Sequence, residues 1–190
     1  MSEPRIAPVE APYESSITES FNRVMPPGME PLKLFRTMAN NPHILNRMFA
    51  GNLLEKGTIA IRDREIVILR TCARCGSEYE WGVHVALFSE RAELSATVVA
   101  ATLGNKQGLD ELSVHDAMLI RVVDELHGTS TISDGLWAKL AEHYTSAQIL
   151  EIIALTGYYH TISFISNAAA VELEAFAPRF SSLGMDHLLD

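Results

Sequence analysis

Glu65 is the residue whose position points most directly to chemistry. In the helix expected over residues 60–74, helical spacing places it on the same side as Ile61, Ile68, Leu69 and Cys72. A carboxylate on an apolar face must find a hydrogen-bonding or cationic partner or hold its proton, because an isolated charge in an apolar medium is very costly. An acid–base site would explain this position. A structural ion pair, with Arg62 or Arg121 as the partner, would explain it equally well.

His84 is a second candidate, in the helix expected over residues 77–90. Glu80 lies one turn before it, so a carboxylate and an imidazole share one face. Ser77 and Glu80 also form an S-x-x-E capping box, and a lone buried histidine is often only a satisfied core residue. Two helices that each carry an acid or base on the apolar face favour a catalytic site formed by Glu65, His84 and Glu80.

Cys72 and Cys75 form a C-x-x-C motif at the carboxyl end of the first of these helices. Thiols at this spacing can react with each other, but a helix C-terminus does not activate a thiolate as an N-terminus does. The pair is therefore either a redox site or two small packing residues.

Metal ligands are weakly represented in the sequence. Two cysteines without a second C-x-x-C or paired histidines do not make the usual four-ligand zinc site. Glu80 and His84 are one residue further apart than the Glu-x-x-His of di-iron bundles. We therefore expect no metal and no cofactor.

Four further side chains are candidate walls of a pocket near these helices: Tyr79, Trp81, Tyr159 and His160. An aromatic wall suits a small cyclic substrate. Ordinary core packing, with the polar tips satisfied inside the bundle, explains the same residues.

The elements that carry these residues are predicted to be helices throughout. Apolar residues recur at three- and four-residue spacing and no strand pattern competes with them, so the fold class is all-α, with about seven to eight helices. The expected ranges are 31–40, 43–55, 60–74, 77–90, 94–103, 113–127, 133–143 and 146–169. The last is apolar nearly all round but carries too many polar residues for lipid, which predicts a buried central helix.

Six of the eight prolines fall in the first thirty or so residues and should prevent any long helix there. We expect a proline-rich N-terminal arm over residues 1–30 that wraps the body or a neighbouring subunit. Residues 31–190 should form a single domain, with its core motif over about residues 43–127.

Composition excludes several kinds of partner. The chain has 190 residues, 47% of them hydrophobic, and a net charge of −9. An excess of acidic residues disfavours binding to nucleic acid and to anionic membrane surfaces, so a small-molecule substrate is expected. Two cysteines and an acidic start without an apolar signal segment predict a cytoplasmic protein.

The blocks DREIVILR over residues 63–70 and GSEYEWGVH over residues 76–84 resemble the core motif of the carboxymuconolactone decarboxylase family, which includes the alkylhydroperoxidase D-like proteins. Residues 157–168, GYYHTISFISNA, resemble the helix that ends such domains. The resemblance covers about residues 40–170. It implies an alkylhydroperoxidase D-like helical bundle, a homo-oligomer, commonly a trimer or hexamer, and a site where the two motif helices pack.

The family has two chemistries. In its peroxidase branch a C-x-x-C opens the second motif helix, and alignment on Glu65 and His84 puts Ser77 and Glu80 at those cysteine positions. Cys72 and Cys75 lie five residues earlier. The sequence thus matches the other branch, which carries out cofactor-free chemistry on small acidic lactones in the breakdown of aromatic compounds.

The function predicted from this resemblance is a cofactor-independent acid–base enzyme acting on a small cyclic carboxylate or lactone, by decarboxylation or a related lyase, isomerase or hydrolase step. His84 would donate the proton, Glu65 would set its tautomer, and Glu80 would orient it. Arg62, Arg70 or a neighbouring subunit would bind the substrate carboxylate. The alternatives are a thiol-dependent, peroxiredoxin-type hydroperoxide reductase using Cys72 and Cys75, and a non-catalytic helical oligomer.

Overall fold

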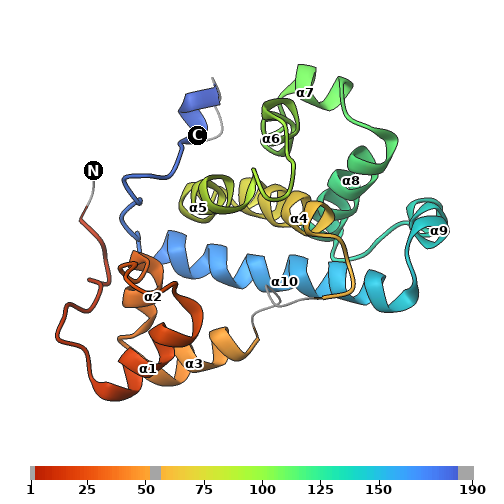
Figure 1. The fold of residues 1–190 in the computed structure, drawn as a ribbon. Helices are drawn as coiled ribbons and strands as arrows, with labels where there is room; N and C mark the ends of the chain where they lie inside the picture. Colours follow the sequence, from red (N-terminus) through yellow and green to blue (C-terminus); the bar gives the residue numbers. More distant parts are fainter. Residues whose placement is uncertain (1–2, 52–56, 184–190) are drawn as a thin grey trace.

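The computed structural model of the chain describes residues 3–51 and 57–183. Within these ranges the secondary structure is entirely helical (Figure 1). The ten α-helices are α1 (Ser15–Val24), α2 (Lys33–Met38), α3 (Pro42–Ala50), α4 (Ile61–Arg74), α5 (Glu78–Phe88), α6 (Ala96–Thr102), α7 (Lys106–Asp110), α8 (Val114–Thr129), α9 (Asp134–His143) and α10 (Ser146–Ala168). A short 3₁₀ helix, η1 (Phe180–Leu183), follows. Eight of the α-helices have seven or more residues, so the predicted all-α class is correct.

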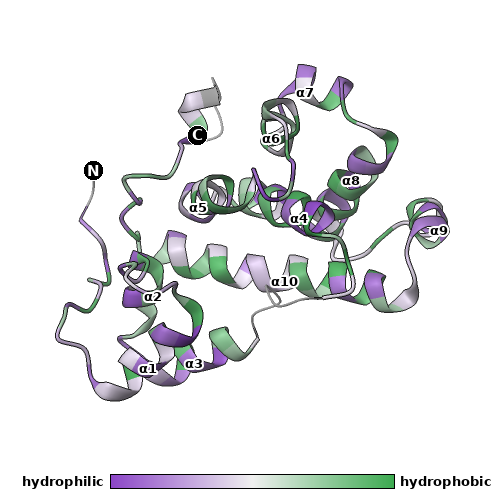
Figure 2. Ribbon diagram, viewed as in Figure 1, coloured by the Kyte–Doolittle hydropathy of each residue, from purple (hydrophilic) through white to green (hydrophobic). Residues whose placement is uncertain are grey.

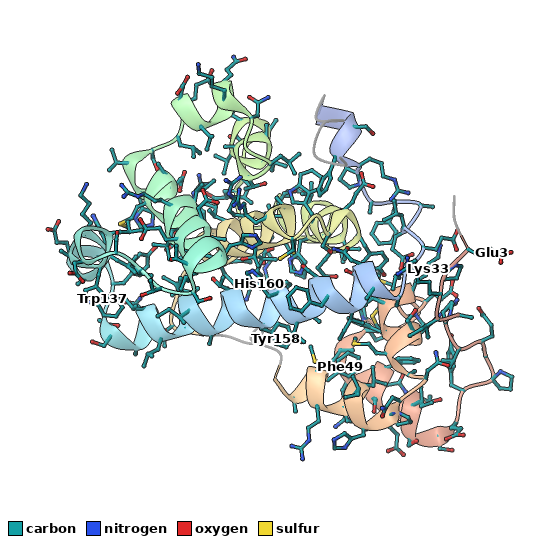
Figure 3. The ribbon with its side chains drawn as sticks, turned by 180° about the vertical axis from the view of Figure 1, so that it is seen from behind. Glu3, Lys33, Phe49, Trp137, Tyr158 and His160 are labelled. Atoms are coloured by element: carbon teal, nitrogen blue, oxygen red, sulfur yellow. The ribbon has the colours of Figure 1, made fainter. Side chains whose placement is uncertain are left out.

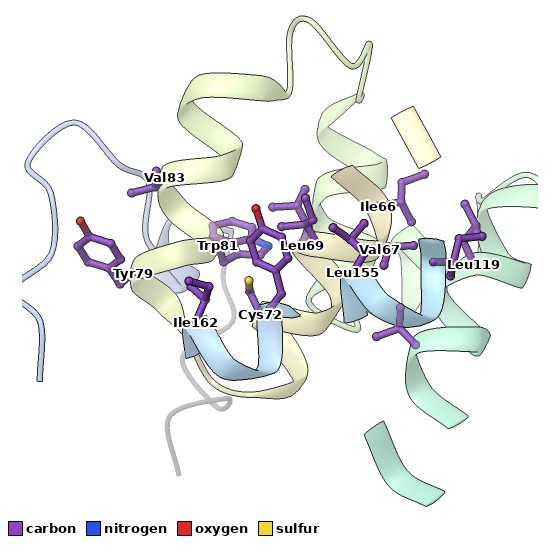
Figure 4. Close-up of a cluster of buried hydrophobic side chains, with 14 of the residues drawn as sticks. Ile66, Val67, Leu69, Cys72, Tyr79, Trp81, Val83, Leu119, Leu155 and Ile162 are labelled. Atoms are coloured by element: carbon purple, nitrogen blue, oxygen red, sulfur yellow. The ribbon is translucent and has the colours of Figure 1, made fainter. Parts of the chain in front are cut away.

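Helix α4 forms the centre of the bundle, packed against α5, α6, α8 and α10 (Figure 1). Four consecutive residues, Ile66 to Leu69, are each at most 1% exposed, which requires packing on every side of the helix. Figure 4 shows part of this core, with side chains of α4, α5, α8 and α10 in contact. The two motif helices therefore meet in the interior.

Helix α10 runs alongside α4 and α5 for the length of the body (Figure 1). A capping box of Thr145 and Gln148 begins it. Its length and apolar composition would allow it to cross a membrane, a property that the core helix of a soluble protein can share. Figure 2 shows polar and apolar residues alternating along it. One side is buried in the core as predicted, and the other is exposed at Leu150 and Phe164.

The N-terminal segment contains a helix that the proline content did not predict. Helix α1 fits between Pro12 and Pro26, and it places Ile17 and Phe21 in the core. The extended residues before it follow the body, where the Arg5 amide donates to the Ala169 carbonyl at 2.9 Å.

The other differences from the expected ranges are small. Helix α3 ends at Ala50 with Gly51 as its C-cap, and residues 52–55 of the expected range lie outside the described residues. The short helix α7 was not predicted. Its cap is Asn105, whose side chain accepts from the Gly108 amide at 3.0 Å.

Candidate active site

Glu65 and His84 are in direct contact inside the bundle. The Glu65 carboxylate accepts a hydrogen bond from His84 Nδ1, with 2.7 Å between Oε2 and Nδ1. Their exposed fractions are 0% and 2%. Helix α4 presents the carboxylate and α5 presents the imidazole, so the two motif helices meet at a buried acid–base pair.

The chain of polar contacts continues to α10. Tyr159 places its hydroxyl 3.0 Å from His84 Nε2 and is itself only 1% exposed. Its ring meets the imidazole edge to face, with centroids 5.1 Å apart. The sequence predicts Tyr159 only as a residue lining a pocket, not as a hydrogen-bonding partner of His84. The hydrogen bond joins residues 75 positions apart, and no local spacing indicates it.

The charge of Glu65 is also compensated on its other oxygen. The Arg64 guanidinium donates to Glu65 Oε1 from Nε at 3.3 Å and from Nη2 at 3.2 Å. The partners suggested from the sequence lie elsewhere: Arg62 binds Asp116 at 2.8 Å, and Arg121 binds Glu125 at 3.2 Å. Glu65 is therefore both ion-paired and bonded to an imidazole.

Glu80 faces His84 and does not cap its helix. Its Oε1 atom lies 3.5 Å from His84 Nε2, and it is 8% exposed. The capping box expected for Ser77 and Glu80 is wrong, because Ser77 instead shares a hydrogen bond of 2.9 Å with Ser166 of α10. The serine thus fixes α5 to α10 and leaves the Glu80 carboxylate beside the imidazole.

These contacts set the protonation states of the site. Burial alone would lower the pKa of His84, but the charge and hydrogen bond of Glu65 and the nearby Glu80 carboxylate outweigh it and raise this pKa to about 9. At neutral pH the imidazole is therefore protonated, and Nε2–H donates to the Tyr159 oxygen. Burial, reinforced by the charges of Glu80 and Glu65, raises the pKa of Tyr159 well above its usual value, so it remains a phenol.

Phe88 covers part of the imidazole. Its ring lies 5.0 Å from the His84 ring, tilted by 33°, and it is half-buried. Five of the surface hollows in the described part of the chain, of about 320–560 Å³ each, are lined by residues other than Glu65, Glu80, His84 and Tyr159. One of them, of about 380 Å³, lies between α8 and α9, remote from the Glu65–His84 pair.

The two cysteines occupy different surroundings. Cys72 is completely buried, and burial together with the charge of Glu80 raises the pKa of its thiol well above the ordinary value. Figure 4 shows it among the apolar side chains of the core. Cys75 is the C-cap of α4 and is partly exposed, with its sulfur 4.0 Å from His127 Nδ1.

The remaining candidates lie away from the Glu65–His84 pair. Tyr79 donates to Glu174 at 2.8 Å and accepts from the Leu34 amide, and Trp81 donates to Thr102 at 3.0 Å. His160 points toward α8 and contacts His127 (Figure 3).

Arg70, suggested as a binder of substrate carboxylate, does not approach the site either. Its guanidinium forms a bidentate pair with Asp124, at 2.8 and 2.9 Å. Arg62 is likewise occupied, by Asp116 and the Glu93 carbonyl. The structure thus brings together Glu65, Glu80, His84 and Tyr159. Five of the other suggested residues lie outside this group: Arg62, Arg70, Tyr79, Trp81 and His160.

Sequence reasoning missed a second buried polar cluster on the opposite side of α4. Tyr144 donates to Asp63 at 2.7 Å, and His115 Nε2 lies 3.1 Å from the other oxygen of that carboxylate. Asp63 is only 8% exposed. That side is covered by α8 and by the residues that join α9 to α10.

Comparison with known proteins supports the fold assignment. No family model matches the sequence, and no curated protein is significantly similar to it. Among solved structures, an uncharacterized peroxidase-related protein from Silicibacter sp. TM1040 superposes with a TM-score of 0.77 at 14% identity, over 92% of this chain and 96% of that one. The debrominase Bmp8, solved in complex with 2,3,4-tribromopyrrole, superposes with a TM-score of 0.64 at 15% identity, over 90% of this chain and 92% of that one. The chain therefore has the alkylhydroperoxidase D-like helical fold that its motifs implied.

Proposed function

We propose that this chain is a cofactor-independent acid–base enzyme acting on a small cyclic carboxylate or lactone. The observation that carries the proposal is the buried hydrogen-bonded chain from Glu65 through His84 to Tyr159. A protonated imidazole held between a carboxylate and a phenol is a pre-oriented proton donor, and acid–base catalysis of this kind contributes about 10²–10⁴-fold to a rate.

Decarboxylation of an unsaturated lactone acid illustrates the chemistry that such a donor supports. The bond from carbon to carboxylate breaks, carbon dioxide leaves, and the electron pair is accepted by the conjugated carbonyl system. The resulting enolate then takes a proton at carbon from His84 Nε2, directly or through the Tyr159 hydroxyl. The imidazole afterwards regains its proton from solvent, so one proton is consumed in each turnover.

Each neighbour of His84 has a separate part in this scheme. Glu65 holds the Nδ1 proton and so fixes which nitrogen faces the substrate. Glu80 stabilises the charged imidazole from one turn away. Phe88, the half-buried ring against the imidazole, is the side chain we expect to move when a substrate enters.

The test is turnover of unsaturated lactone acids in D₂O, followed by proton NMR. A decarboxylase should replace the lost carboxylate by deuterium at one carbon. We expect His84→Gln to lower the rate by about 10²–10⁴-fold, the share ascribed to a positioned acid. Exposed His43 provides the control, because His43→Gln removes an imidazole on α3, away from the site, and should leave the rate unchanged.

The proposal fails if the wild-type protein turns over none of these compounds and shifts none of their NMR signals. It fails equally if a folded His84→Gln variant retains the wild-type rate. The first result would favour the non-catalytic helical oligomer.

A thiol-dependent hydroperoxide reductase is the second candidate. Two observations favour it: one neighbour in fold is described as peroxidase-related, and both Cys72 and Cys75 are free thiols three residues apart. It predicts hydroperoxide consumption in the presence of a dithiol, lost in Cys72→Ser. The burial and raised pKa of the Cys72 thiol favour the acid–base enzyme instead. The thiolate is the reactive form, and a raised pKa keeps the thiol protonated.

A further inference from the structure

Three potential metal ligands converge on one side of α10, outside the Glu65–His84 site. Cys75 is the C-cap of α4, His127 lies in the last turn of α8, and His160 lies in the second half of α10. The Cys75 sulfur and one ring nitrogen from each histidine all lie within 4.8 Å of one another. His127 Nδ1 is 2.9 Å from His160 Nε2 and 4.0 Å from the Cys75 sulfur. All three side chains are partly exposed, so an ion has a route of entry from solvent.

The tautomer of His160 is fixed by its other nitrogen. His160 Nδ1 lies 2.9 Å from the Thr156 carbonyl, and a carbonyl only accepts, so Nδ1 carries the proton. Nε2 therefore presents a lone pair toward His127 and Cys75. A backbone carbonyl that holds the outer N–H of a histidine is the usual support of a metal-ligating imidazole.

The cysteine is also held in place. Its backbone carbonyl accepts from the side-chain amide nitrogen of Asn167 on α10 at 2.8 Å, which ties the end of α4 to the helix that carries His160. The nearby arginines are already paired, since Arg70 and Arg74 both contact Asp124. Their charges are therefore partly neutralised by that carboxylate.

We propose that Cys75, His127 and His160 bind one Zn²⁺ ion, with the fourth position open to solvent. One sulfur and two imidazole nitrogens are ligands typical of zinc, whereas Mg²⁺ and Ca²⁺ prefer oxygen. Usual Zn–N and Zn–S lengths and tetrahedral angles require about 3.3 Å between the nitrogens and about 3.6 Å between sulfur and nitrogen. The observed 2.9 and 4.0 Å each differ from these by about 0.4 Å, a shift within the reach of side-chain rotation.

Binding changes the protonation of two ligands. The Cys75 thiol loses its proton to solvent as the Zn–S bond forms. The His127 proton moves from Nδ1, where it is shared with His160, to Nε2, so that Nδ1 can bind the ion. One proton is thus released for each ion bound, about the amount expected when the thiol is the only protonated ligand.

The test uses Co²⁺ as a spectroscopic probe on the full, reduced chain after treatment with a chelator. We expect one Co²⁺ per chain, with a thiolate-to-cobalt charge-transfer band in the near ultraviolet and visible bands of four-coordinate intensity, both removed by added Zn²⁺. Cys75→Ser should abolish the charge-transfer band. His127→Gln and His160→Gln should each weaken Zn²⁺ binding by more than about 100-fold, since loss of an outer partner alone costs about 10–100-fold.

Matched controls distinguish binding at Cys75, His127 and His160 from nonspecific metal binding. Cys72→Ser removes the other thiol and His43→Gln removes an exposed imidazole, and both should keep the band and the stoichiometry. The proposal is overturned if Co²⁺ gives no charge-transfer band, or if the band survives in Cys75→Ser. It is overturned also if His43→Gln weakens binding as much as His127→Gln does. Circular dichroism of each variant checks folding, and His127→Gln, at a partly exposed position, provides a test independent of the cysteine.

Discussion

At the scale of single residues, Glu65 is held in the interior by partners on both oxygens. Arg64 bonds one oxygen and His84 the other, and a buried ion pair is tolerated when its remaining lone pairs are satisfied. Removing one partner of such a pair typically costs about 3–5 kcal/mol, because the other charge is left uncompensated. The side chains that would perform catalysis are thus also required for the stability of the core.

The raised pKa of His84 predicts a pH dependence of stability. Its pKa is about 9 in the folded protein against 6.5 in the unfolded chain, so folding favours the protonated form. The stabilisation is complete below pH 6.5 and is lost as the pH rises through 9. With about 1.4 kcal/mol for each unit of pKa, the loss amounts to about 3 kcal/mol.

The measurement is the free energy of unfolding at pH 6.5 and 9.5 for wild type and for His84→Gln. Wild type should lose about 3 kcal/mol more than the variant over this interval. Comparison with the variant cancels the contribution of Cys72, whose raised pKa also lowers stability at high pH. Proton NMR of the His84 ring gives a second check, and titration at or below pH 6.5 would contradict the argument.

The residues that were predicted from sequence are those whose contacts follow from helical spacing. Glu65 and His84 each fall on the apolar face of a single helix, and the motif linked the two helices. The contact of Tyr159 with His84, and the convergence of Cys75, His127 and His160, depend on the register between helices that are 33 to 75 positions apart. Spacing along one helix contains no information on that register.

At the scale of elements, helices were predictable wherever apolar periodicity and caps coincided. All eight expected helices are present, and six of them begin within one residue of their expected starts: α3, α4, α5, α8, α9 and α10. Helix α1 was not predicted, because the prolines were expected to prevent a long helix, and this ten-residue helix fits between two of them. A central helix buries its polar side as well, provided that each polar group finds a partner, as Asp63 does in Tyr144 and His115.

The packing of α5 against the C-terminal segment depends on a glycine. A Cβ atom on Gly82 would lie 2.5 Å from the Pro178 carbonyl oxygen and 3.2 Å from the Ala177 Cβ. Gly82→Ala must therefore push residues 177–178 away from the helix. We expect destabilisation of about 1–3 kcal/mol, the usual cost of overpacking, against a gain of up to about 1 kcal/mol from helix propensity.

Thermal or denaturant unfolding measures this change, and Gly135→Ala in α9 is the control. A Cβ on Gly135 meets nothing within 4 Å, so this variant should be neutral or slightly stabilised. Equal stability of the two variants would mean that the C-terminal segment does not pack on α5 in solution.

At the scale of the whole molecule, α10 has an apolar face that the body leaves uncovered. Leu150 is 67% exposed and Phe164 is 64% exposed, and both lie on the side of the helix away from the core. Ala154, Gly157 and Thr161 lie between them on the same exposed stripe. Large exposed apolar side chains in a row along a helix are typical of an interface between proteins.

We expect the occupant of this face to be a second copy of the chain, in keeping with the trimer or hexamer implied by the sequence motifs. Light scattering coupled to gel filtration should give a multiple of 21.0 kDa for wild type and a smaller particle for Leu150→Glu with Phe164→Glu. Trp137→Glu on α9 is the control for a charge elsewhere on the surface, because it places one carboxylate at a large apolar residue that is 46% exposed and lies outside the stripe. If the measured mass of the wild-type particle equals that of one chain, the homo-oligomer is excluded. An assembly unaffected by both substitutions would place its interface elsewhere. An assembly that dissociates only when the α10 face is charged would show that the apolar content of this helix supports both the core of one chain and contact with the next.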